Sequence, residues 1–357
     1  MAFAKTHCAT AEVELEEQSP LPKIDRRTDL PVLLIHNLDD AWEPADLEKA
    51  LDEVDDLEKA LRSQGHPVTN IPVYDWDLVG RLKHFDPNGC IVFNGCESLP
   101  GIPFSEARVA QILESLGFTY TGSPPEVLAT GWDKAKVKRR LGGSGVPIPS
   151  WKIFTSPEQD GWREFPAIVK PAREHSSCGV SRESVVLSHE KMLARIAYVQ
   201  NEFQQPVIVE DFIDGREFHV SLWGNQSVEM LPPAEMDFSA FHDLQDRLCT
   251  FDAKYTPQSR AYEKICVRIP ASLTGAEYRE LERVARKAYR VIGCRDYARL
   301  DIRLRDGVFC ILDVNPNPDI SSDTSMAFAA ELAGYSYGVM LSQMVNFAAR
   351  RHPVLRH

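Results

Sequence analysis

The sequence predicts an α/β protein built from three modules, and three observations support this prediction. Strand-like and helix-like segments alternate through residues 31–122, and the alternation starts again after residue 124. The 357 residues provide enough chain for two or three hydrophobic cores. Alternation of this kind is typical of an open, largely parallel sheet covered by helices. We place the modules at residues 31–123, 124–224 and 225–357, after a flexible leader at residues 1–30.

The first module opens with a buried strand, PVLLIHN, at residues 31–37. Residues 44–63 then repeat apolar side chains at steps of four and three, which predicts an amphipathic helix; the stripe comprises Leu47, Leu51, Val54, Leu57 and Leu61. The two LEKAL copies in this helix are too few for a coiled coil, so we favour a helix packed on a sheet. Strands at 68–75 and 89–95 and a helix at 105–117, closed by Gly117, complete the module.

The second module begins near Pro124 with a basic helix that ends at the GGSG of residues 142–145. Its cations are Lys134, Lys136, Lys138, Arg139 and Arg140, and we expect all but one or two of them to face solvent. Strands follow at 165–171 and within 206–224, with a helix at about 189–203 between them. The third module ends in a helix near 337–350.

Composition excludes several function classes. The 52 acidic and 40 basic residues give a net charge of -12, which disfavours a nucleic-acid partner. The longest apolar runs are strand-sized and the N-terminal residues lack a signal-peptide core, so we expect no membrane association and a cytoplasmic location. The chain also lacks zinc-type cysteine spacing, a Walker A lysine loop, H-E-x-x-H and G-x-S-x-G.

Residues 297–315, YARLDIRLRDGVFCILDVN, predict a β-hairpin with its tip at Asp306-Gly307. A three-residue loop, 305–307, with glycine in the left-handed region is one common solution. That loop pairs Leu304 with Val308. The same register places Arg299 opposite Asp313, and Asp301 opposite Ile311.

The two faces of this hairpin differ in chemistry, because side chains alternate along a strand. One face is wholly apolar and is expected to meet the core: Leu300, Ile302, Leu304, Val308, Cys310, Leu312 and Val314. The other gathers polar groups: Arg299, Asp301, Arg303, Asp313 and Asn315. Oxygen ligands of this kind suit Mg²⁺ completed by phosphate and water. The alternative is a solvent-facing strand with ordinary ion pairs.

With these motifs in order, the sequence resembles the ATP-grasp superfamily, and within it proteins similar to D-alanine–D-alanine ligase, over residues 88–345. The resemblance implies an ATP-grasp fold in which ATP lies between the central and C-terminal sheets. It implies a carboxylate–amine ligase that forms an acyl phosphate, with ATP and Mg²⁺ as cofactors and Mn²⁺ as an alternative metal. The implied partners are small amino-acid or peptide substrates, and a homodimer is left open.

The resemblance also assigns residues. Lys134, Lys170 and Lys254 fall on phosphate-binding lysines, and Glu174 and Ser176 on a serine-rich loop that arranges the substrate pocket. The resemblance assigns nucleoside binding to Glu210, to the backbone of Asp211, Phe212 and Ile213, to Glu217, and to Leu312. Tyr255 lies near the substrate, Arg299 stabilises the tetrahedral oxyanion, and Asp301, Asp313 and Asn315 bind the metal. The family usually has glutamate in place of Asp313.

Three departures concern the substrates. The family's acid for the substrate ammonium has no clear counterpart, and only Asp39, Asp40 and Glu43 are candidates. The family's loop rich in histidine, glycine and acids before the second helix is replaced by NGCESLPGIPFSEAR. Where the ligases have Pro-Gly, this chain has Pro318-Asp319. A carboxylate there would repel an acceptor carboxylate, so Asp319 is predicted to line the acceptor pocket and to favour a neutral or cationic group. The alternative is that Asp319 caps the following helix.

The resulting hypothesis is an ATP-dependent ligase with an unidentified substrate. The two alternatives are an authentic D-alanine–D-alanine ligase and a nucleotide-binding regulatory protein without turnover. Residues 235–256 end at Lys254 and Tyr255 and are long for a structureless connection, which predicts a mobile lid.

Overall fold

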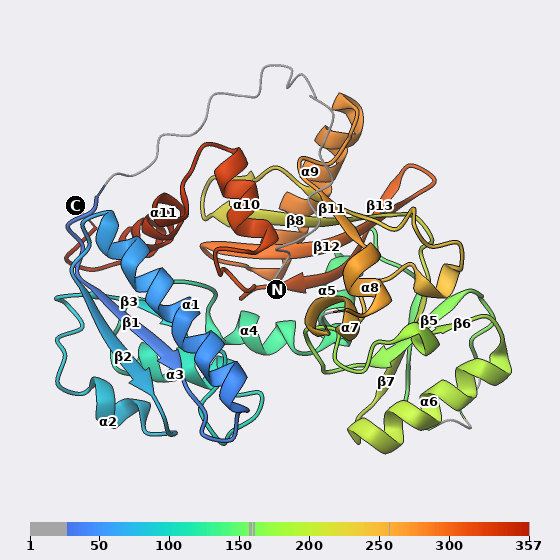
Figure 1. Ribbon diagram of the computed structural model, residues 1–357, viewed down its shortest axis with the longest axis horizontal. Helices are drawn as coiled ribbons and strands as arrows, with labels where there is room; N and C mark the ends of the chain where they lie inside the picture. The colour runs from blue at the N-terminus through green and yellow to red at the C-terminus, as the bar shows by residue number, and fades with distance from the viewer. Residues whose placement is uncertain (1–26, 157–158, 160, 257, 357) are drawn as a thin grey trace.

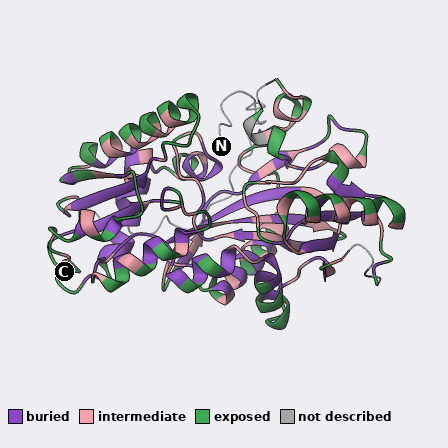
Figure 2. Ribbon diagram, turned by 90° about the horizontal axis from the view of Figure 1, so that it is seen from below, coloured by how far each residue is buried: buried purple, intermediate pink, exposed green. Residues whose placement is uncertain are grey.

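The computed structural model describes residues 27–156, 159, 161–256 and 258–356. It contains three β-sheets with helices around them (Figure 1). The leader predicted at residues 1–30 lies outside the described residues up to residue 26. Strands are mostly buried, and many of the helices expose their outer faces (Figure 2).

The N-terminal sheet confirms the predicted parallel arrangement. Its order is β2-β1-β3, with β1 (Val32–Asn37) between β2 (Val68–Val73) and β3 (Ile91–Gly95), and both pairings are parallel. Helices α1 (Pro44–Ser63) and α3 (Glu106–Ser115) fall where the periodicity predicts them. The short α2 (Leu78–Leu82) was not predicted, because five residues are too few to show a helical period.

Helix α1 buries only the C-terminal part of its predicted apolar stripe. Leu57 and Leu61 are buried, whereas Leu51 is 46% exposed. The buried end packs against α11 (Tyr337–Ala349), which shares one hydrophobic core with β1 and β3. The C-terminal helix therefore joins the N-terminal sheet to the rest of the chain.

The central sheet is antiparallel, with the order β4-β7-β5-β6. Its strands are β4 (Trp151–Phe154), β5 (Ala167–Pro171), β6 (Val185–Val186) and β7 (Val207–Asp211). Helix α6 (His189–Phe203) covers it, as predicted, and begins at Ser188, whose side chain accepts a hydrogen bond from the backbone N–H of Lys191.

The third sheet has the order β11-β10-β8-β12-β13, and β9 (Val228–Met230) pairs with β8. Its main strands are β8 (Arg216–Gly224), β10 (Ala234–Asp237), β11 (Cys266–Arg268), β12 (Tyr297–Arg305) and β13 (Val308–Asn315). Helix α9 (Gly275–Ile292) packs on it. The predicted boundary between the second and third modules, at 224–225, would separate β8 from this sheet. Because β8 belongs to the third sheet, the boundary lies between Asp211 and Arg216.

The remaining helices connect these sheets. Helices α4 (Pro125–Gly131) and α5 (Lys134–Gly143) follow the N-terminal module, and α5 contacts α9 and β13. Helix α10 (Ser325–Leu332) precedes α11. The shorter helices are η1 (Arg182–Ser184), η2 (Leu244–Asp246), α7 (Phe251–Tyr255) and α8 (Arg260–Lys264). None of the helices in the described part of the chain is long and apolar enough to cross a bilayer.

The β12–β13 hairpin corrects the predicted register. Its loop has two residues, because Asp306 (φ 53°) and Gly307 (φ 76°) both adopt the left-handed region that a tight hairpin turn requires. Arg305 therefore pairs with Val308. A bulge next to Asp301 and Ile302 shifts the register once more, so Asp301 pairs with Asp313 and Arg299 with Asn315.

The shorter turn and the bulge each shift the pairing by one residue, and a total shift of two residues returns each side chain to its predicted face. The polar face near the base of the hairpin was therefore predicted correctly. The apolar face was wrong in β13, where Phe309 and Ile311 are buried instead of Cys310 and Leu312. Val308 is 47% exposed at the tip. A turn one residue shorter exchanges the faces of the following strand until the bulge restores them.

The segment predicted as a lid, residues 235–256, is not a structureless connection. Most of β10, η2 and α7 lie within it. The backbone of Lys254 and Tyr255 belongs to α7, while their side chains lie outside what the structure describes. The roles of these two residues stay predictions.

Candidate active site

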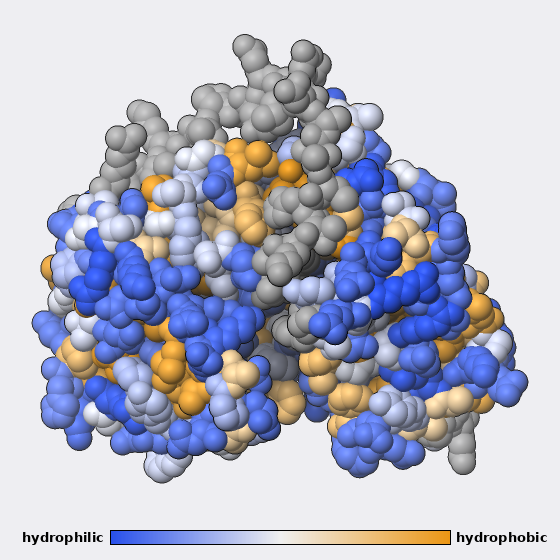
Figure 3. Space-filling view, in the orientation of Figure 1, coloured by the Kyte–Doolittle hydropathy of each residue, from blue (hydrophilic) through white to orange (hydrophobic). Residues whose placement is uncertain are grey.

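A cleft between the central and third sheets brings together most of the predicted site residues. We call it the lysine cleft; it holds about 980 Å³ of space up to its open mouth. Of the predicted residues, the following line it: Lys134, Lys170, Glu174, Ser176, Glu210, Asp211, Phe212, Ile213, Glu217, Arg299, Asp301, Leu312, Asp313 and Asn315. In the space-filling view, a notch at the lower edge separates the N-terminal module on the left from the central module on the right (Figure 3).

Two lysines and one glutamate form a buried ionic group in this cleft. The Glu210 carboxylate lies 3.1 Å from the Lys170 Nζ and 3.2 Å from the Lys138 Nζ. Burial alone would raise the pKa of Glu210, but the two ammonium groups hold it below its ordinary value. Burial lowers the pKa of Lys138, whereas Glu210 and Asp313 outweigh burial and raise the pKa of Lys170.

Lys138 was missed at the sequence level, since a basic helix is usually a solvated face. The expectation that one or two of its five cations are buried is confirmed: Lys134 is 7% exposed and Lys138 is 2% exposed. Lys138 also donates a hydrogen bond to the Leu312 carbonyl at 3.3 Å, which connects α5 to β13. The spacing Asp133-Lys134 and Lys138 places both lysines on one helix face, and this is the signal that could have identified Lys138.

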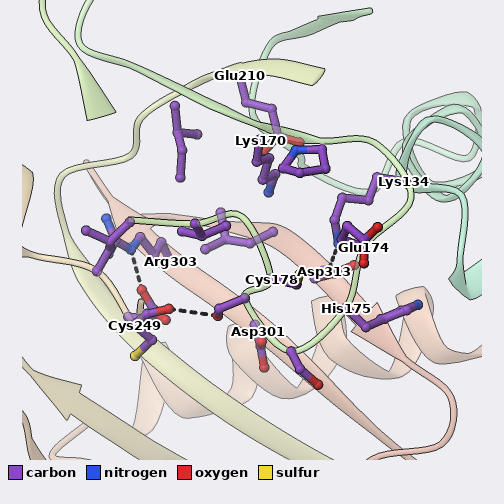
Figure 4. A pocket seen from close by; sticks show the side chains of 18 of the residues that line it. Lys134, Lys170, Glu174, His175, Cys178, Glu210, Cys249, Asp301, Arg303 and Asp313 are labelled. Carbon is purple, nitrogen blue, oxygen red and sulfur yellow. Dashed lines mark hydrogen bonds and ion pairs between the residues drawn. The ribbon is translucent and has the colours of Figure 1, made fainter. Parts of the chain in front are cut away.

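The polar face of the hairpin presents its acids already paired with cations. The Lys134 Nζ lies 2.6 Å from the Asp313 Oδ2 (Figure 4). The Arg299 Nε lies 2.9 Å from the Asp301 Oδ1. Burial would raise the pKa of Asp313, but Lys134, His175 and Lys170 together hold it below its ordinary value. Asn315 accepts a hydrogen bond from the backbone N–H of Asn317 at 3.1 Å through its side-chain oxygen.

Two carboxylates and one amide oxygen on a single face fit a hard divalent cation. Asp301 and Asp313 stand directly opposite each other across the bulge, and both remain partly exposed to the cleft. Elsewhere in the described residues, Glu217, His219 and Cys249 offer ligand atoms within 4.8 Å of one another. Glu217, however, is already engaged by Arg303 at 2.7 Å.

Arg303 is a second residue that the sequence did not identify. It donates to Glu217 and, at 2.7 Å, to the Ile213 carbonyl, and it also bonds to the Arg247 carbonyl. Its guanidinium lies over the Phe212 ring at 4.7 Å from the ring centre. Arg303 is 2% exposed and holds three segments of the cleft wall in fixed positions.

The serine-rich loop covers the cleft in a strained conformation. Ser176 and Ser177 have φ angles of 55° and 63°, which are uncommon for residues other than glycine and cluster at functional sites. The Ser177 hydroxyl donates to the Cys249 carbonyl at 2.8 Å. The Glu174 carboxylate accepts a hydrogen bond from Gln205 at 2.8 Å. The loop is thus held from both sides of the cleft.

A second space adjoins the lysine cleft, and we call it the acidic cavity. It consists of two connected hollows of about 1120 and 850 Å³ that share Glu53, Glu97, Asn317 and Asp319. The first hollow also shares His175, Ser176, Arg299 and Asn315 with the lysine cleft. Its walls come from α1, the loops after β3 and β13, and the start of α3.

Asp319 lines both hollows of this cavity and does not cap the following helix. Its carboxylate accepts hydrogen bonds from the Ser321 backbone N–H at 2.9 Å and from the Ser321 hydroxyl. The N-cap of α10 is Thr324, which accepts from Ala327. The helix-cap alternative for Asp319 is therefore wrong.

The acids found at the cavity are not the three that the sequence singled out. Asp39 accepts hydrogen bonds from the backbone N–H groups of Ala41 at 3.0 Å and Gly101 at 2.9 Å, which ties two loops together. Neither Asp39, Asp40 nor Glu43 is among the described residues that line the cavity. Glu53 on α1 and Glu97 after β3 line it instead.

Glu106 is the most buried acid of the cavity. Its two carboxylate oxygens accept hydrogen bonds from Trp132 Nε1 at 2.9 Å and Asn317 Nδ2 at 2.7 Å. Burial raises the pKa of Glu106 to about 7, and the nearby Glu97 adds to this effect.

Comparisons with known proteins identify the family to which this chain is similar. Residues 143–346 match the family described as D-ala D-ala ligase C-terminus. The D-alanine–D-alanine ligase of Alcanivorax borkumensis is 31% identical over 71% of this chain and 76% of its own length. An uncharacterized protein, y4sG, of Sinorhizobium fredii is 32% identical over 84% of this chain and 88% of its own.

Solved structures show the same fold. The D-alanine–D-alanine ligase of Bacillus anthracis, complexed with ATP, has a TM-score of 0.70 at 20% identity, covering 90% of this chain and 98% of that one. This likeness confirms the predicted ATP-grasp fold.

Proposed function

This chain belongs to the D-alanine–D-alanine ligase family of ATP-grasp enzymes, and from that premise we propose how it joins a carboxylate to an amine. A substrate carboxylate oxygen attacks the γ-phosphorus of ATP and releases ADP. The amine nitrogen then attacks the acyl carbon, the bond from that carbon to the phosphate oxygen breaks, and the nitrogen loses a proton. The products are an amide, ADP, phosphate and a proton.

One observation carries the proposal: the lysine cleft holds ammonium groups and carboxylates as exchangeable pairs. Lys134 reaches the cleft from α5 and Lys170 from β5, and each is held by an acid, Asp313 or Glu210. Entering phosphates would offer these lysines stronger anionic partners, since hydrogen bonds between charged groups are short and strong. The acids released by this exchange would then face the cleft.

Mg²⁺ would fit at Asp301, Asp313 and Asn315, where it would offset phosphate charge during transfer. The chain's own residues prepare this place. Arg299 holds Asp301, and Lys134 holds Asp313, so both carboxylates stay oriented on one face. Aspartate at position 313 is one methylene shorter than the glutamate that the family usually has.

The nucleoside would lie against the wall formed by Glu210 to Ile213 and by Leu312, with Glu217 at the ribose. This wall is rigid, because Arg303 ties Glu217 to the Ile213 carbonyl. Glu210 has a second task that the sequence did not indicate, which is to position the Lys138 and Lys170 ammonium groups.

The two substrates would meet where the lysine cleft and the acidic cavity join. Arg299 and Ser176 line both spaces, and the Arg299 guanidinium is buried and already ionised. A fixed positive charge at this point would stabilise the oxyanion that forms when the amine attacks. Lys254 and Tyr255 would add to the site from α7.

A label-transfer experiment tests the reaction. Amino acids, amines and dipeptides, D-alanine included, are screened for stimulated ADP formation, and the best carboxylate is then supplied with ¹⁸O in its carboxyl group. One labelled oxygen should appear in the released phosphate, because the C–O bond breaks after phosphoryl transfer. Stimulated ADP formation with unlabelled phosphate would exclude the acyl phosphate. Stimulation by D-alanine alone would identify the ordinary ligase of the family.

A further inference from the structure

The acidic cavity has a charge that does not suit a free α-amino acid as acceptor. Resting on the ligase function proposed above, we propose that the amine substrate carries a second cationic group, which lies among Glu53, Glu97 and Asp319, and has no carboxylate there. Aliphatic diamines, and amines that end in a guanidinium group, are the substrate class.

The two ends of the cavity have different tasks. His175, Ser176, Arg299 and Asn315 line its border with the lysine cleft, where the new bond would form. Glu53, Glu97 and Asp319 line the other end, where the cavity continues between β1, α1 and α11. A molecule that spans the cavity would therefore present one nitrogen to Arg299 and its far end to the three carboxylates.

The described lysine and arginine of the cavity wall already have acidic partners. Among the described residues that line the first hollow, the lysine and arginine side chains are Lys49 and Arg299. Lys49 lies 3.3 Å from Glu53, and Arg299 lies 2.9 Å from Asp301. No described residue forms a hydrogen bond or ion pair with the Glu97 carboxylate. A substrate carboxylate would find acids here and no unengaged lysine or arginine.

Mutual repulsion among the acids points to the same ligand. Burial raises the pKa of Glu97, and the Asp319 and Glu53 carboxylates raise it further. Burial also raises the pKa of Glu53, although Lys49 opposes this. An ammonium or guanidinium group between these side chains would relieve the repulsion, and a carboxylate would increase it.

The arrangement also separates the two protonation states that a diamine must adopt. The attacking nitrogen has to be neutral, and Arg299 beside it disfavours a second positive charge. The distant nitrogen is surrounded by carboxylates, which favour its protonated form. The cavity would thus bind the monoprotonated diamine in one orientation.

Three compounds of equal chain length test the proposal: 1,4-diaminobutane, n-butylamine and 4-aminobutyrate. Calorimetry with the full chain, saturated with a non-hydrolysable ATP analogue and Mg²⁺, measures their dissociation constants. We expect 1,4-diaminobutane to bind at least about fivefold more tightly than n-butylamine, a ratio that corresponds to roughly 1 kcal/mol. We expect 4-aminobutyrate to bind most weakly. Equal affinities, or preference for 4-aminobutyrate or D-alanine, would overturn the proposal.

Substitutions locate the effect. Glu97→Gln and Asp319→Asn should each reduce the diaminobutane-to-butylamine ratio at least threefold, because each removes one negative charge at the distant end. Asp52→Asn, on the exposed side of α1, should leave the ratio unchanged. An unchanged ratio in both cavity variants, with the fold intact by circular dichroism, would also refute the proposal.

The same titrations separate this proposal from the function on which it rests. Nucleotide binding is measured first, in the absence of amine. Failure to bind the ATP analogue would refute the proposed ligase function. Normal nucleotide binding with no preference for the diamine would refute the substrate class alone.

Discussion

The lysine cleft and the acidic cavity share a wall at Arg299 but handle charge in opposite ways. In the cleft, Lys134, Lys138 and Lys170 each lie within 3.2 Å of a carboxylate oxygen. Among the described residues of the cavity, carboxylates outnumber lysines and arginines, and neighbouring acids raise the pKa of Glu53, Glu97 and Glu106. A surface of paired ions can accept a polyanion by exchanging partners, whereas a surface of crowded acids favours a cation. The following predictions test this difference, from the largest effect to the smallest.

The largest effect is expected at Asp313, on the floor of the lysine cleft. Asp313→Ala removes a carboxylate of the proposed metal face and should reduce turnover by about a thousandfold or more, since metal stabilisation of a phosphoryl transition state is worth several kcal/mol. ADP release with the stimulating substrates measures it. Asp306→Asn, at the exposed tip of the same hairpin, is the control. A folded Asp313→Ala protein with turnover near that of the control would contradict the role.

The second prediction breaks the buried ion group. Lys138→Met should destabilise the fold by about 3 kcal/mol, because it leaves Glu210 buried with one partner instead of two. Urea denaturation followed by circular dichroism measures the change. Lys136→Met, two residues away on the same helix but with its side chain 58% exposed, should cost less than about 0.5 kcal/mol. Equal midpoints for the two variants would show that the group is not stabilising.

The third prediction concerns nucleotide affinity. Lys170→Ala should weaken ATP binding by roughly 1.5 to 3 kcal/mol, the range for a hydrogen bond to a charged group. Isothermal calorimetry measures it, and Lys191→Ala on the exposed side of α6 serves as the control. If both variants bind ATP like the wild type, Lys170 does not contact the phosphates.

The smallest effect is expected at Glu106 in the acidic cavity. Its pKa is raised from the ordinary 4.5 to about 7, so the folded protein holds this proton more tightly than the unfolded chain does. Stability from this group is complete below about pH 4.5 and is lost as pH rises through about 7. Burial is the main cause of the raised pKa, Glu97 raises it further, and the hydrogen bonds from Asn317 and Trp132 oppose the rise.

Glu106→Gln isolates this contribution, because the substitution removes the titrating group. Any change in stability that the substitution itself causes at pH 5 does not affect the pH dependence. Between pH 5 and pH 8 the variant should lose less stability than the wild type, as measured by denaturation at both pH values. Subtracting the stability change of the variant from that of the wild type cancels the contributions of the other titrating groups. Parallel pH profiles would show that Glu106 ionises normally.

Much of the lysine cleft could be predicted from sequence because its parts are local motifs. Lys170 lies near the end of β5, just before the serine-rich loop, while Asp301, Asp313 and Asn315 lie on one hairpin. Their face was predicted correctly although the register was wrong, since a shorter turn and a bulge shift the pairing by two residues in total. Lys138 was not predicted, because a run of cations on one helix usually marks a solvated face, as at Lys136, which is exposed.

By itself, the sequence determined the parallel first sheet, most helices and strands, the lysines of the cleft that are proposed to bind phosphate, and the oxygen-bearing hairpin face. These follow from alternation, helical period and turn residues, which act over a few residues. Only the tertiary structure decided which sheet receives β8, that Glu210 holds two lysines, and that Glu53, Glu97, Glu106 and Asp319 line one cavity. Those acids come from α1, a loop, α3 and another loop. Their combined field depends on distances through space, which no local pattern of residues encodes.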